Sequence, residues 1–476
     1  MKVLMLNPPY GKDFCRSARW AAKSRGRVQR HPDWMLIAAA VLEDAGHEVK
    51  FVDGAALNLE RDEIKNIIRD FSPSMVVIHT TTPSIYNDIS YASLAKEVCR
   101  PVIVLIGAHV SAEFEDTFRI SNGAVDIIAL GEYDYTLRDI ASGKPVKDIE
   151  GLAYQEKGAV IKTPERPMLD VRELPFPAWR HIKPEWYQDA GKRFPFLTLI
   201  SGRGCFARCT FCRDTPVMYG RRLRLREPAQ VVDEMEYDIK LFPYIREIMF
   251  ETDTFTASRG HVEGVCEGIL KRGLKISWSC NARVDIDLSL LPLMKKAGCR
   301  MLMVGFEFGT QEALDSVEKG TKLEQARRFA EEASRLGFII HGCFMIGAPG
   351  ETKETARATI EFAKSLPVDT IQISGICTYP GTEMYKWAKE KGYLVPKDWR
   401  EWIDNELEQC TLLSYPQLSK EEIDSLIDEG LKSFYLRPRQ MLRMALNMRN
   451  MGDVKRKLYG LKSFLGYFKK EGAISR

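Results

Sequence analysis

Apolar and polar positions alternate in two distinct ways along the first 141 residues. Short runs rich in β-branched side chains recur at 2–8, 48–54, 75–80, 102–107 and 126–131. Longer stretches with helical spacing of apolar residues, such as 35–46 and 86–99, separate these runs. Runs that are apolar throughout are typical of parallel strands covered on both faces. The pattern therefore predicts an α/β domain over residues 1–141, built on a doubly wound parallel sheet whose ligands lie beyond the C-terminal strand ends.

A second alternation begins at residue 196. Its apolar runs lie at 196–201, 246–251, 276–281, 301–306, 339–345 and 370–376. Amphipathic stretches, including 228–242 and 322–337, separate them. Six β/α repeats are too few to close an eight-stranded barrel, so we predict a partial (β/α)6 TIM-type barrel over 196–399. In either form the chemistry belongs at the C-terminal ends of the strands.

The segments that flank this barrel follow different patterns. Residues 142–195 are predicted to be a linker with a small hairpin, because the Pro-x-Pro within Leu174–Arg180 breaks both helix and strand ladder. Residues 400–476 lack strand-like runs and are predicted to form a helical, basic C-terminal region.

Composition narrows the class of protein. The 476 residues are 45% hydrophobic and 28% charged with a net charge of +4, which is ordinary for a soluble globular protein and too small to indicate nucleic acid binding. The longest apolar run, Trp34–Leu42, is much shorter than the about 20 residues that cross a bilayer, and Met1–Asn7 reads as a strand rather than a signal peptide. The eleven scattered cysteines favour a reducing cytoplasm over a disulfide framework.

Three cysteines crowd into eight residues, at Cys205, Cys209 and Cys212. Thiolates bind soft or borderline metals, so zinc and iron–sulfur are the candidates. Structural zinc wants a fourth ligand nearby, yet the next histidine is His261 and the next cysteine is Cys266. Three thiol ligands on one loop leave one coordination position of the metal centre open, which favours an iron–sulfur cluster. Structural zinc and plain buried thiols are the alternatives.

The Cys-x3-Cys-x2-Cys spacing after the first barrel strand, with Phe211 before the third cysteine, resembles the radical S-adenosylmethionine (SAM) superfamily. The resemblance implies a [4Fe–4S] cluster on Cys205, Cys209 and Cys212, whose fourth iron chelates the amino and carboxylate groups of SAM. One electron from the cluster would then cleave the sulfonium and yield a 5′-deoxyadenosyl radical.

The same resemblance implies SAM contacts at further strand ends. "FETDTFT" (250–256) is similar to the Phe-x-Asp-Asp-x-Phe stretch of a cobalamin-linked subgroup, although Thr252 replaces its first aspartate. "WSCNARVD", "VGFEFGTQ", "GCFMIGAPGE" and "YPGTEMY" continue the pattern. The implied SAM-binding residues are Phe211, Asp253, Asn281, Arg283, Glu307 and Gly347. As structural alternatives, Glu351 starts a helix and the glycines serve only as turn residues.

Three other cysteines, Cys280, Cys343 and Cys377, also fall near predicted strand ends. A thiol that faces the cavity could donate a hydrogen atom to a product radical. The more common role of such a residue is that of a small buried apolar side chain.

A Rossmann-like domain before a radical SAM barrel resembles a cobalamin-binding arrangement. The implied contacts follow the strands: Asn7, Pro8, Thr80, Thr81, Thr82, Gly107, His109, Gly131 and Glu132. The Asp-x-His-x-x-Gly loop that supplies an axial histidine in other cobalamin proteins is absent, and "NPPYGKDFCRS" follows the first strand instead. No axial histidine is therefore predicted. His109 is a cofactor contact or a structural histidine.

The last forty residues are strongly basic. Residues 437–476 hold eleven Lys and Arg against Asp453 and Glu471, with apolar side chains at near-helical spacing. A basic amphipathic helix can lie on an anionic membrane, so peripheral membrane contact is one expectation. The alternative is a helix packed on the barrel with a solvated basic face. No stacking platform for nucleic acid is evident.

Within the superfamily, 305–314, 339–366 and 379–392 resemble the hopanoid cyclitol-ether synthase and anaerobic magnesium-protoporphyrin cyclase types. This resemblance predicts a rearrangement or cyclisation of a lipid-like or polycyclic substrate, with electrons from a donor such as flavodoxin or ferredoxin. Cobalamin-dependent C-methylation, which consumes two SAM per turnover, is the alternative. A non-enzymatic iron–sulfur sensor is a third, different class.

Overall fold

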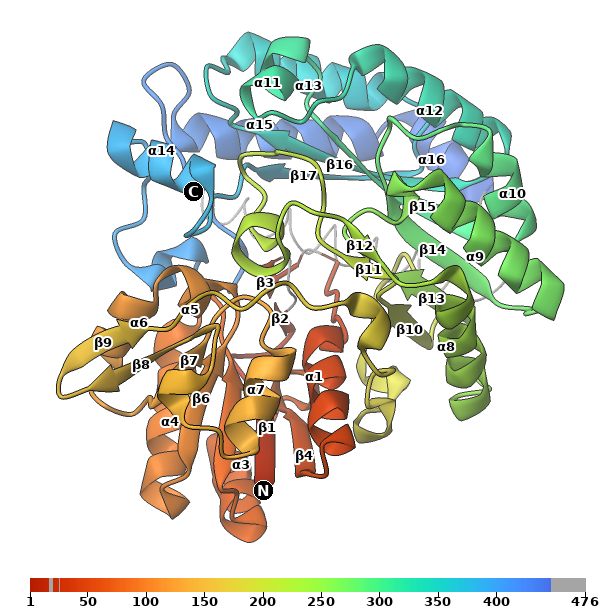
Figure 1. The fold of residues 1–476 in the computed structure, drawn as a ribbon. Coiled ribbons are helices and arrows are strands. Elements are labelled where there is room, and N and C mark those ends of the chain that lie inside the picture. Colours follow the sequence, from red (N-terminus) through yellow and green to blue (C-terminus); the bar gives the residue numbers. More distant parts are fainter. Residues whose placement is uncertain (17–19, 25, 447–476) are drawn as a thin grey trace.

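Two large β-sheets organise the chain, one in the lower half and one in the upper half of Figure 1. The computed structural model describes residues 1–16, 20–24 and 26–446. The first sheet has seven strands and the second has six. This arrangement confirms the predicted α/β class, a doubly wound sheet followed by a partial barrel.

The N-terminal sheet has the strand order β4-β1-β5-β6-β7-β8-β9. Its five parallel strands fall on the five predicted runs: β1 (Lys2–Asn7), β4 (Glu48–Asp53), β5 (Met75–His79), β6 (Val102–Ile106) and β7 (Ile127–Ala129). The hairpin expected in the linker forms from β8 (Leu152–Glu156) and β9 (Ala159–Lys162). Because β8 pairs antiparallel with β7, the sheet continues past residue 141.

The alternation of side chains along β1 explains why its sequence is apolar throughout. Val3 and Met5 belong to one buried cluster, and Leu4 and Leu6 to another. The first cluster includes residues of α1 (Asp33–Asp44) and α7 (Asp134–Ala141) and continues into the barrel. The second includes residues of α3 (Arg61–Phe71), α4 (Ile85–Cys99) and α6 (Phe114–Ser121). One face of the sheet therefore shares its core with the barrel.

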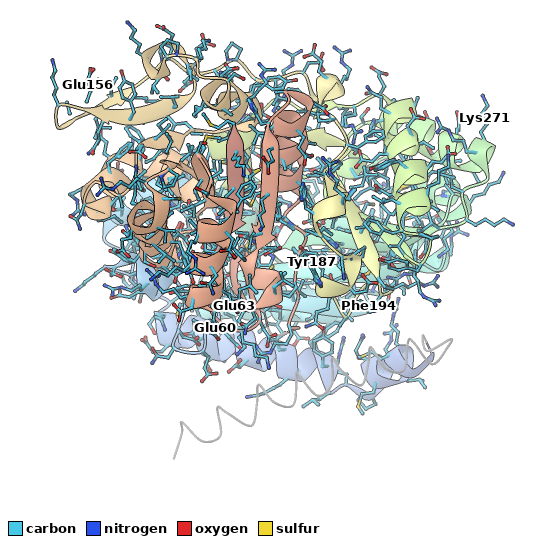
Figure 2. The ribbon with its side chains drawn as sticks, turned by 90° about the horizontal axis from the view of Figure 1, so that it is seen from below. Glu60, Glu63, Glu156, Tyr187, Phe194 and Lys271 are labelled. Carbon is cyan, nitrogen blue, oxygen red and sulfur yellow. The ribbon has the colours of Figure 1, made fainter. Side chains whose placement is uncertain are left out.

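Shorter elements complete this half of the chain. They are the ribbon of β2 (Phe14–Arg16) and β3 (Ala21–Lys23), and the helices α2 (Gly54–Leu57) and α5 (Ala108–Ala112). The linker contains single 3-10 turns at Val146–Asp148, Val171–Glu173, Trp179–His181 and Pro184–Trp186. Tyr187 of the linker lies between the two sheets (Figure 2), where its hydroxyl donates to Asp53 Oδ2 at 2.8 Å and its ring packs on His31.

The second sheet is parallel in the order β10-β13-β14-β15-β16-β17 and does not close. Its strands match the six predicted runs: β10 (Phe196–Leu199), β13 (Glu247–Phe250), β14 (Ser277–Ala282), β15 (Cys299–Glu307), β16 (Ile339–Ile346) and β17 (Thr370–Gly375). The helices are α8 (Pro228–Leu241), α9 (Arg259–Arg272), α10 (Leu290–Lys296), α11 (Gln311–Ser316), α12 (Leu323–Arg335), α13 (Lys353–Ser365) and α14 (Glu383–Lys391), with a 3-10 turn at Phe255–Ala257. The helices lie outside the sheet (Figure 1).

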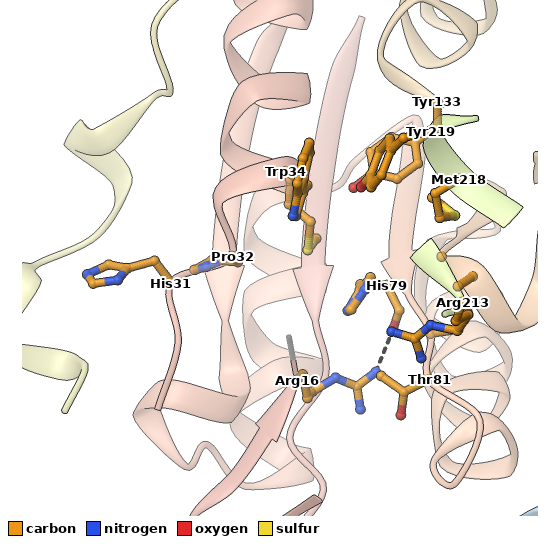
Figure 3. Close-up of a pocket in the computed structure, with 14 residues that line it drawn as sticks. Arg16, His31, Pro32, Trp34, His79, Thr81, Tyr133, Arg213, Met218 and Tyr219 are labelled. Carbon is orange, nitrogen blue, oxygen red and sulfur yellow. Dashed lines mark hydrogen bonds between the residues drawn. The ribbon is translucent and has the colours of Figure 1, made fainter. Parts of the chain in front are cut away.

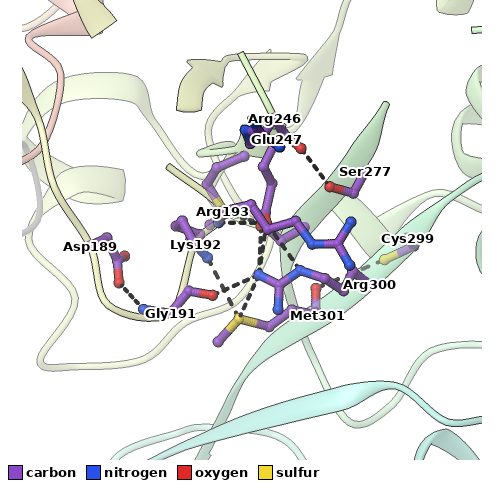
Figure 4. Close-up of polar contacts among 12 residues, drawn as sticks. Asp189, Gly191, Lys192, Arg193, Arg246, Glu247, Ser277, Cys299, Arg300 and Met301 are labelled. Atoms are coloured by element: carbon purple, nitrogen blue, oxygen red, sulfur yellow. Dashed lines mark hydrogen bonds and ion pairs between the residues drawn. The ribbon is translucent and has the colours of Figure 1, made fainter. Parts of the chain in front are cut away.

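The linker closes the N-terminal end of the barrel with buried charge (Figure 4). Glu247, at the start of β13, accepts from Arg300 at 2.7 Å and from the Arg193 N–H at 3.0 Å. Lys192 is fully buried, with its Nζ 3.0 Å from Met303 Sδ. These side chains therefore fill the N-terminal end of the strands.

The C-terminal region covers the open edge of the barrel. Beyond a 3-10 turn at Trp399–Trp402, it holds α15 (Lys420–Tyr435) and α16 (Pro438–Leu446). The Tyr435 hydroxyl donates to the Ile371 carbonyl at 2.7 Å and accepts from the Ile371 N–H at 2.9 Å, which satisfies the edge strand β17. Residues 403–419 are not helical, contrary to the prediction for 400–476. The basic stretch 447–476 lies outside the described residues.

No helix in the described ranges combines the length and the apolar character that crossing a membrane requires.

We expect stability to depend on pH through Asp33, at the contact between α1 and β10. Thr198 donates to Asp33, yet burial dominates and raises the pKa of this carboxyl well above its usual value. The folded state thus holds a proton that the unfolded state releases, so the free energy of unfolding falls as pH rises from the ordinary aspartate range toward the folded pKa. Asp33→Asn should flatten this dependence in thermal denaturation between pH 5 and pH 8. An unchanged slope in this variant would contradict the assignment.

Candidate functional site

The loop that carries the three cysteines begins just after β10. A two-residue antiparallel ribbon, β11 (Gly202–Arg203) with β12 (Arg224–Leu225), closes its base. A single π-helical turn, Thr215–Tyr219, follows the third cysteine. Gly204 precedes the first cysteine with φ +81°, and a Cβ there would lie 2.3 Å from the Arg222 carbonyl oxygen. Only glycine fits this close approach, so the turn that starts the loop depends on it.

The cysteines themselves are reduced and largely buried. All eleven cysteines of the chain are free thiols. Thr254 lies 3.6 Å from Cys205 Sγ, and Thr215 lies 3.6 Å from Cys212 Sγ. Burial raises the pKa of the Cys209 thiol, and burial followed by Asp214 raises that of Cys212 to about 11. Metal binding must therefore displace protons from these thiols.

The donor set fits an iron–sulfur cluster by its chemistry. Three thiols on one loop, with cations beside them, are suited to a negatively charged cluster that takes thiolate ligands. Among the residues that the structure describes, no three His, Cys, Asp or Glu side chains are grouped closely enough to hold a single metal ion.

Two ion pairs lie beside these thiols. Arg283 Nη2 lies 2.8 Å from Asp285 Oδ2, its guanidinium is 5.5 Å from the Phe206 ring centroid, and it acts electrostatically on Cys209 and Cys205. Lys319 Nζ lies 2.6 Å from Glu307 Oε1, and Lys319 acts on Cys209. Both signs of charge are thus present for the ammonium and carboxylate of an amino acid ligand, as the implied roles of Arg283 and Glu307 require.

Glu307 is held in an unusual backbone conformation. Its φ is +65°, and the register between β15 and β16 shifts between Gly305 and Glu307. A non-glycine residue in the left-handed region costs energy and is most common where function requires it. The bulge turns the Glu307 carboxylate toward Lys319, a residue that the sequence analysis missed. A buried lysine carries no local sequence signal, because its partner lies twelve positions away.

The remaining residues assigned to SAM are spread around the same rim. Phe211 is half-buried in the cysteine loop, and Asp253 acts electrostatically on Cys212. Asn281 Nδ2 donates to the Thr252 carbonyl at 3.1 Å, which ties β14 to the loop after β13. Gly347 follows β16, where its N–H donates to Glu351 and its carbonyl accepts from Tyr415.

Glu351 therefore has the structural role that the sequence analysis gave as its alternative. Its Oε2 accepts from the N–H groups of Gly347 and Ala348, which shapes the turn before α13. Burial raises the pKa of this carboxyl to about 7, while the two N–H groups oppose the rise.

The three further thiols have different surroundings. Cys280 is fully buried on the side of β14 that carries Trp278, where it contacts Cys299 beneath the helices. Cys377 packs in a small cluster with Tyr379 and Trp402. Cys343 lies among the half-buried positions of β16 that line the barrel interior. Cys343 is thus placed in the interior, and Cys377 also lies toward the cysteine loop, since Arg213 lies 4.6 Å from the ring centroid of its neighbour Tyr379.

A small pocket that is partly open to solvent lies between the N-terminal sheet and the cysteine loop (Figure 3), with a cavity volume of about 40 Å³. Its lower wall consists of strand ends and their loops, including His79, Thr80, Thr81 and Gly107. Arg213, Met218 and Tyr219 from the loop that follows Cys212 form another wall. The strand order reverses between β1 and β5, which places this pocket at the switch point where doubly wound sheets bind ligands.

Unpaired buried polar atoms mark this end of the sheet. No hydrogen bond partner lies within reach of Thr82 Oγ1 or of either ring nitrogen of His109. Burial lowers the pKa of His109 to about 3, so its ring is neutral at physiological pH. The His109 ring packs edge-on against Trp399, with 4.9 Å between the ring centroids. A Cβ on Gly107 would lie 2.7 Å from the Thr80 carbonyl. Thr80, Thr81 and Gly107 line the pocket, whereas Thr82 and His109 are not among its lining residues.

Other residues assigned to cobalamin have protein partners. Asn7 donates to Asp53 Oδ1 at 2.9 Å and accepts from Arg16 at 3.0 Å. Pro8 follows it in the same loop. The Gly131 N–H donates to Ser111 Oγ at 3.0 Å. These three residues shape the loops at the strand ends.

Glu132 instead joins the two halves of the chain. Its carboxylate accepts from both Nη atoms of Arg224 at 2.8 Å, and Arg203 lies 2.7 Å from the neighbouring Asp134. Arg203 is buried, and its guanidinium lies over Trp34. The role of Glu132 is thus to hold the barrel domain against the N-terminal sheet.

Known protein families match two parts of the chain. The radical SAM superfamily matches residues 199–363, and the B12 binding domain matches residues 25–141. The chain is 30% identical to an uncharacterized methyltransferase of Pyrococcus horikoshii, over 93% of this chain and 94% of that protein. It is 27% identical to the anaerobic magnesium-protoporphyrin IX monomethyl ester cyclase of Rubrivivax gelatinosus, over 82% of this chain and 70% of that protein.

A solved structure shares the fold over nearly the whole chain. It is the radical SAM methyltransferase TsrM of Kitasatospora setae, determined with cobalamin and a [4Fe–4S] cluster bound. The TM-score is 0.72 at 17% identity, with 98% of this chain and 99% of that chain covered.

We expect Gly204→Ala to lose most of its bound iron and sulfide after anaerobic reconstitution. The added methyl group meets backbone oxygens that cannot move aside, so Cys205 is displaced. Gly260→Ala is the matched control, because nothing lies within 4 Å of a Cβ at that helical position. Equal iron content in both variants would show that the turn at Gly204 does not position Cys205.

Proposed function

Because the chain belongs to the radical SAM superfamily and carries a B12-binding domain, we propose that it is a cobalamin-dependent methyltransferase acting on an unactivated carbon. The observation that carries the proposal is the pocket between the domains (Figure 3). Its walls come from the strand ends of the B12-binding domain and from the loop that continues the cysteine motif. A methyl carrier bound there shares a wall with the site of radical formation.

In this proposal, different residues of the chain hold the cluster, SAM and cobalamin. Cys205, Cys209 and Cys212 hold the cluster, while Arg283, Glu307 and Lys319 face the charged end of SAM. Thr80, Thr81 and Gly107 line the pocket in which cobalamin would bind. When bound, the cluster supplies the electron that cleaves SAM, and cobalamin supplies the carrier for a methyl group. The buried charges at the barrel's other end exclude water from that side.

Methyl transfer replaces the rearrangement or cyclisation that the sequence analysis favoured. The relative that covers almost the whole chain is named a methyltransferase, and so is the structure with the same fold. The relation to a cyclase is more distant and less complete. Cyclisation of a polycyclic substrate is therefore the second candidate.

Product analysis separates these candidates. In an anaerobic assay with SAM, a strong one-electron reductant, bound cobalamin and a lipid-like or polycyclic test substrate as methyl acceptor, methylation should give 5′-deoxyadenosine and S-adenosylhomocysteine in about equal amounts. Cyclisation should give 5′-deoxyadenosine without S-adenosylhomocysteine. Cys212→Ala, which lacks one of the proposed cluster ligands, is the control. This variant should form neither 5′-deoxyadenosine nor S-adenosylhomocysteine by a reaction that depends on the cluster. Absence of 5′-deoxyadenosine from the wild-type protein under strong reductant would contradict the enzyme proposal and favour a sensor.

We also propose that α16 contacts an anionic lipid surface, which suits a lipid-like substrate. Gln440 and Arg443 tie one side of this helix to Asp369 of the barrel. Met441 and Leu442 of this helix, and Leu436 between α15 and α16, are between 58% and 62% exposed. Basic residues follow in the sequence, with eight Lys and Arg in 447–476 against two acidic residues. Apolar side chains with adjacent cations are typical of interfacial helices.

Vesicle flotation tests this contact. The wild-type chain should float with phosphatidylglycerol vesicles and much less with phosphatidylcholine vesicles, since the basic residues add electrostatic attraction. Substituting glutamine at 436, 441 and 442 together should lower binding several-fold. Removal of residues 447–476 in a second variant should do the same. Undiminished flotation of both variants would refute the contact, and phosphatidylcholine binding of equal strength would refute the charge argument.

We expect a flavodoxin or a ferredoxin to supply the electron for this reaction. Replacing the chemical reductant by either protein with its reductase tests that expectation.

A further inference from the structure

Two buried ion pairs lie against the cysteine loop. The Thr210 N–H of this loop donates to the Val317 carbonyl at 3.0 Å, which brings the turn that carries Lys319 to the loop, and the Arg283 guanidinium lies 5.5 Å from the Phe206 ring centroid. Among the charges that act on the Cys209 thiol, Lys319 has the largest effect and opposes the raising of its pKa by burial, ahead of Glu307. Arg283 acts on both Cys209 and Cys205. Its partner Asp285 is the more exposed member of that pair, with side-chain exposures of 23% and 10%. Each pair is neutral as a whole, and each places a cation beside the loop that carries Cys205 and Cys209.

Burial strengthens the effect of these cations. Lys319 and Glu307 are 7% and 8% exposed, and Arg283 is 8% exposed. Charges that are shielded from water interact over several ångströms far more strongly than charges at the surface. Burial lowers the pKa of Lys319, but Glu307 and Cys209 more than offset this effect, so the ammonium stays protonated at neutral pH.

We propose that Lys319, held by Glu307, raises the reduction potential of the cluster and so eases the uptake of the electron that starts the reaction. This inference rests on the proposed function, because it requires the cluster on Cys205, Cys209 and Cys212. Reduction adds one negative charge, which comes from an external one-electron donor. Lys319 and Arg283 stabilise that charge at close range, and cluster potentials respond to nearby charge in this way. Lys319 thus places a positive charge beside the cluster and does not bind iron itself.

The arrangement around Gly305 shows that the pair is built into the strand. A Cβ at this position would lie 2.3 Å from Glu307 Oε1 and 2.9 Å from Lys319 Nζ. The missing side chain leaves room for the ion pair over the backbone of β15. The space is specific to the pair, so a methyl group there should displace the pair without changing the number of charges.

The test uses substitutions that change the charge in opposite directions at Lys319 and at Glu307. The midpoint potential of the reconstituted cluster is measured without SAM by redox titration with electron paramagnetic resonance detection, so that SAM binding does not contribute. Lys319→Met should shift the potential to more negative values, and Glu307→Gln should shift it to more positive values. The double variant should return close to the wild-type potential, because the pair is neutral in both. Lys319→Arg should preserve the wild-type value.

Lys192→Met is the matched control, since Lys192 is also a fully buried lysine but lies at the opposite end of the strands. The cluster of this variant should have the same midpoint potential as the cluster of the wild type. Shifts of the same sign in Lys319→Met and Glu307→Gln, or no shift in either with the cluster intact, would overturn the inference. If Lys319→Met assembles no cluster, Glu307→Gln and Gly305→Ala carry the test, and an unshifted potential in both overturns it. Failure of the wild-type chain to assemble any four-iron cluster would instead refute the proposed function.

Discussion

The two-residue ribbon of β11 and β12 is the constraint on which both halves of the site depend. Its backbone ladder closes the base of the loop with the three cysteines. The same two strands carry Arg203 and Arg224, whose guanidinium groups bind the carboxylates of Asp134 and Glu132 in the N-terminal domain. Breaking a buried pair of this kind leaves an uncompensated charge, which is strongly unfavourable. The ribbon therefore fixes the cysteine loop and the domain interface together.

The position of the pocket follows from that interface. Trp34 of α1 stacks on Tyr219 of the cysteine loop at 4.3 Å between ring centroids, and both line the pocket. The core on this face of the N-terminal sheet is continuous with the core of the barrel, so the two domains are packed together and not merely linked. Two cofactors bound on either side of this wall would keep a constant spacing, which suits a reaction that passes a group between them.

Closure of the barrel elsewhere directs access to the same rim. Buried charge around Glu247 and Lys192 fills the N-terminal end, and Tyr435 satisfies the backbone of the edge strand. The C-terminal strand ends are left for ligands, and the polar groups of the chain gather there. Glu307 has a left-handed backbone at this rim, which the surrounding packing sustains.

Hydrophobic periodicity by itself determined the strands, the main helices and the two-domain order, because buried strands and amphipathic helices have patterns local to the sequence. The cysteine spacing likewise gave the proposed cluster ligands, since all three lie on one loop. Only the tertiary structure decided which charges meet: Glu132 faces two arginines, Lys319 faces Glu307, and His109 lacks hydrogen bond partners. It also decided which thiols face the interior, placing Cys280 beneath the helices. These outcomes depend on contacts between residues distant in sequence, and burial then sets their strength. No local pattern encodes either.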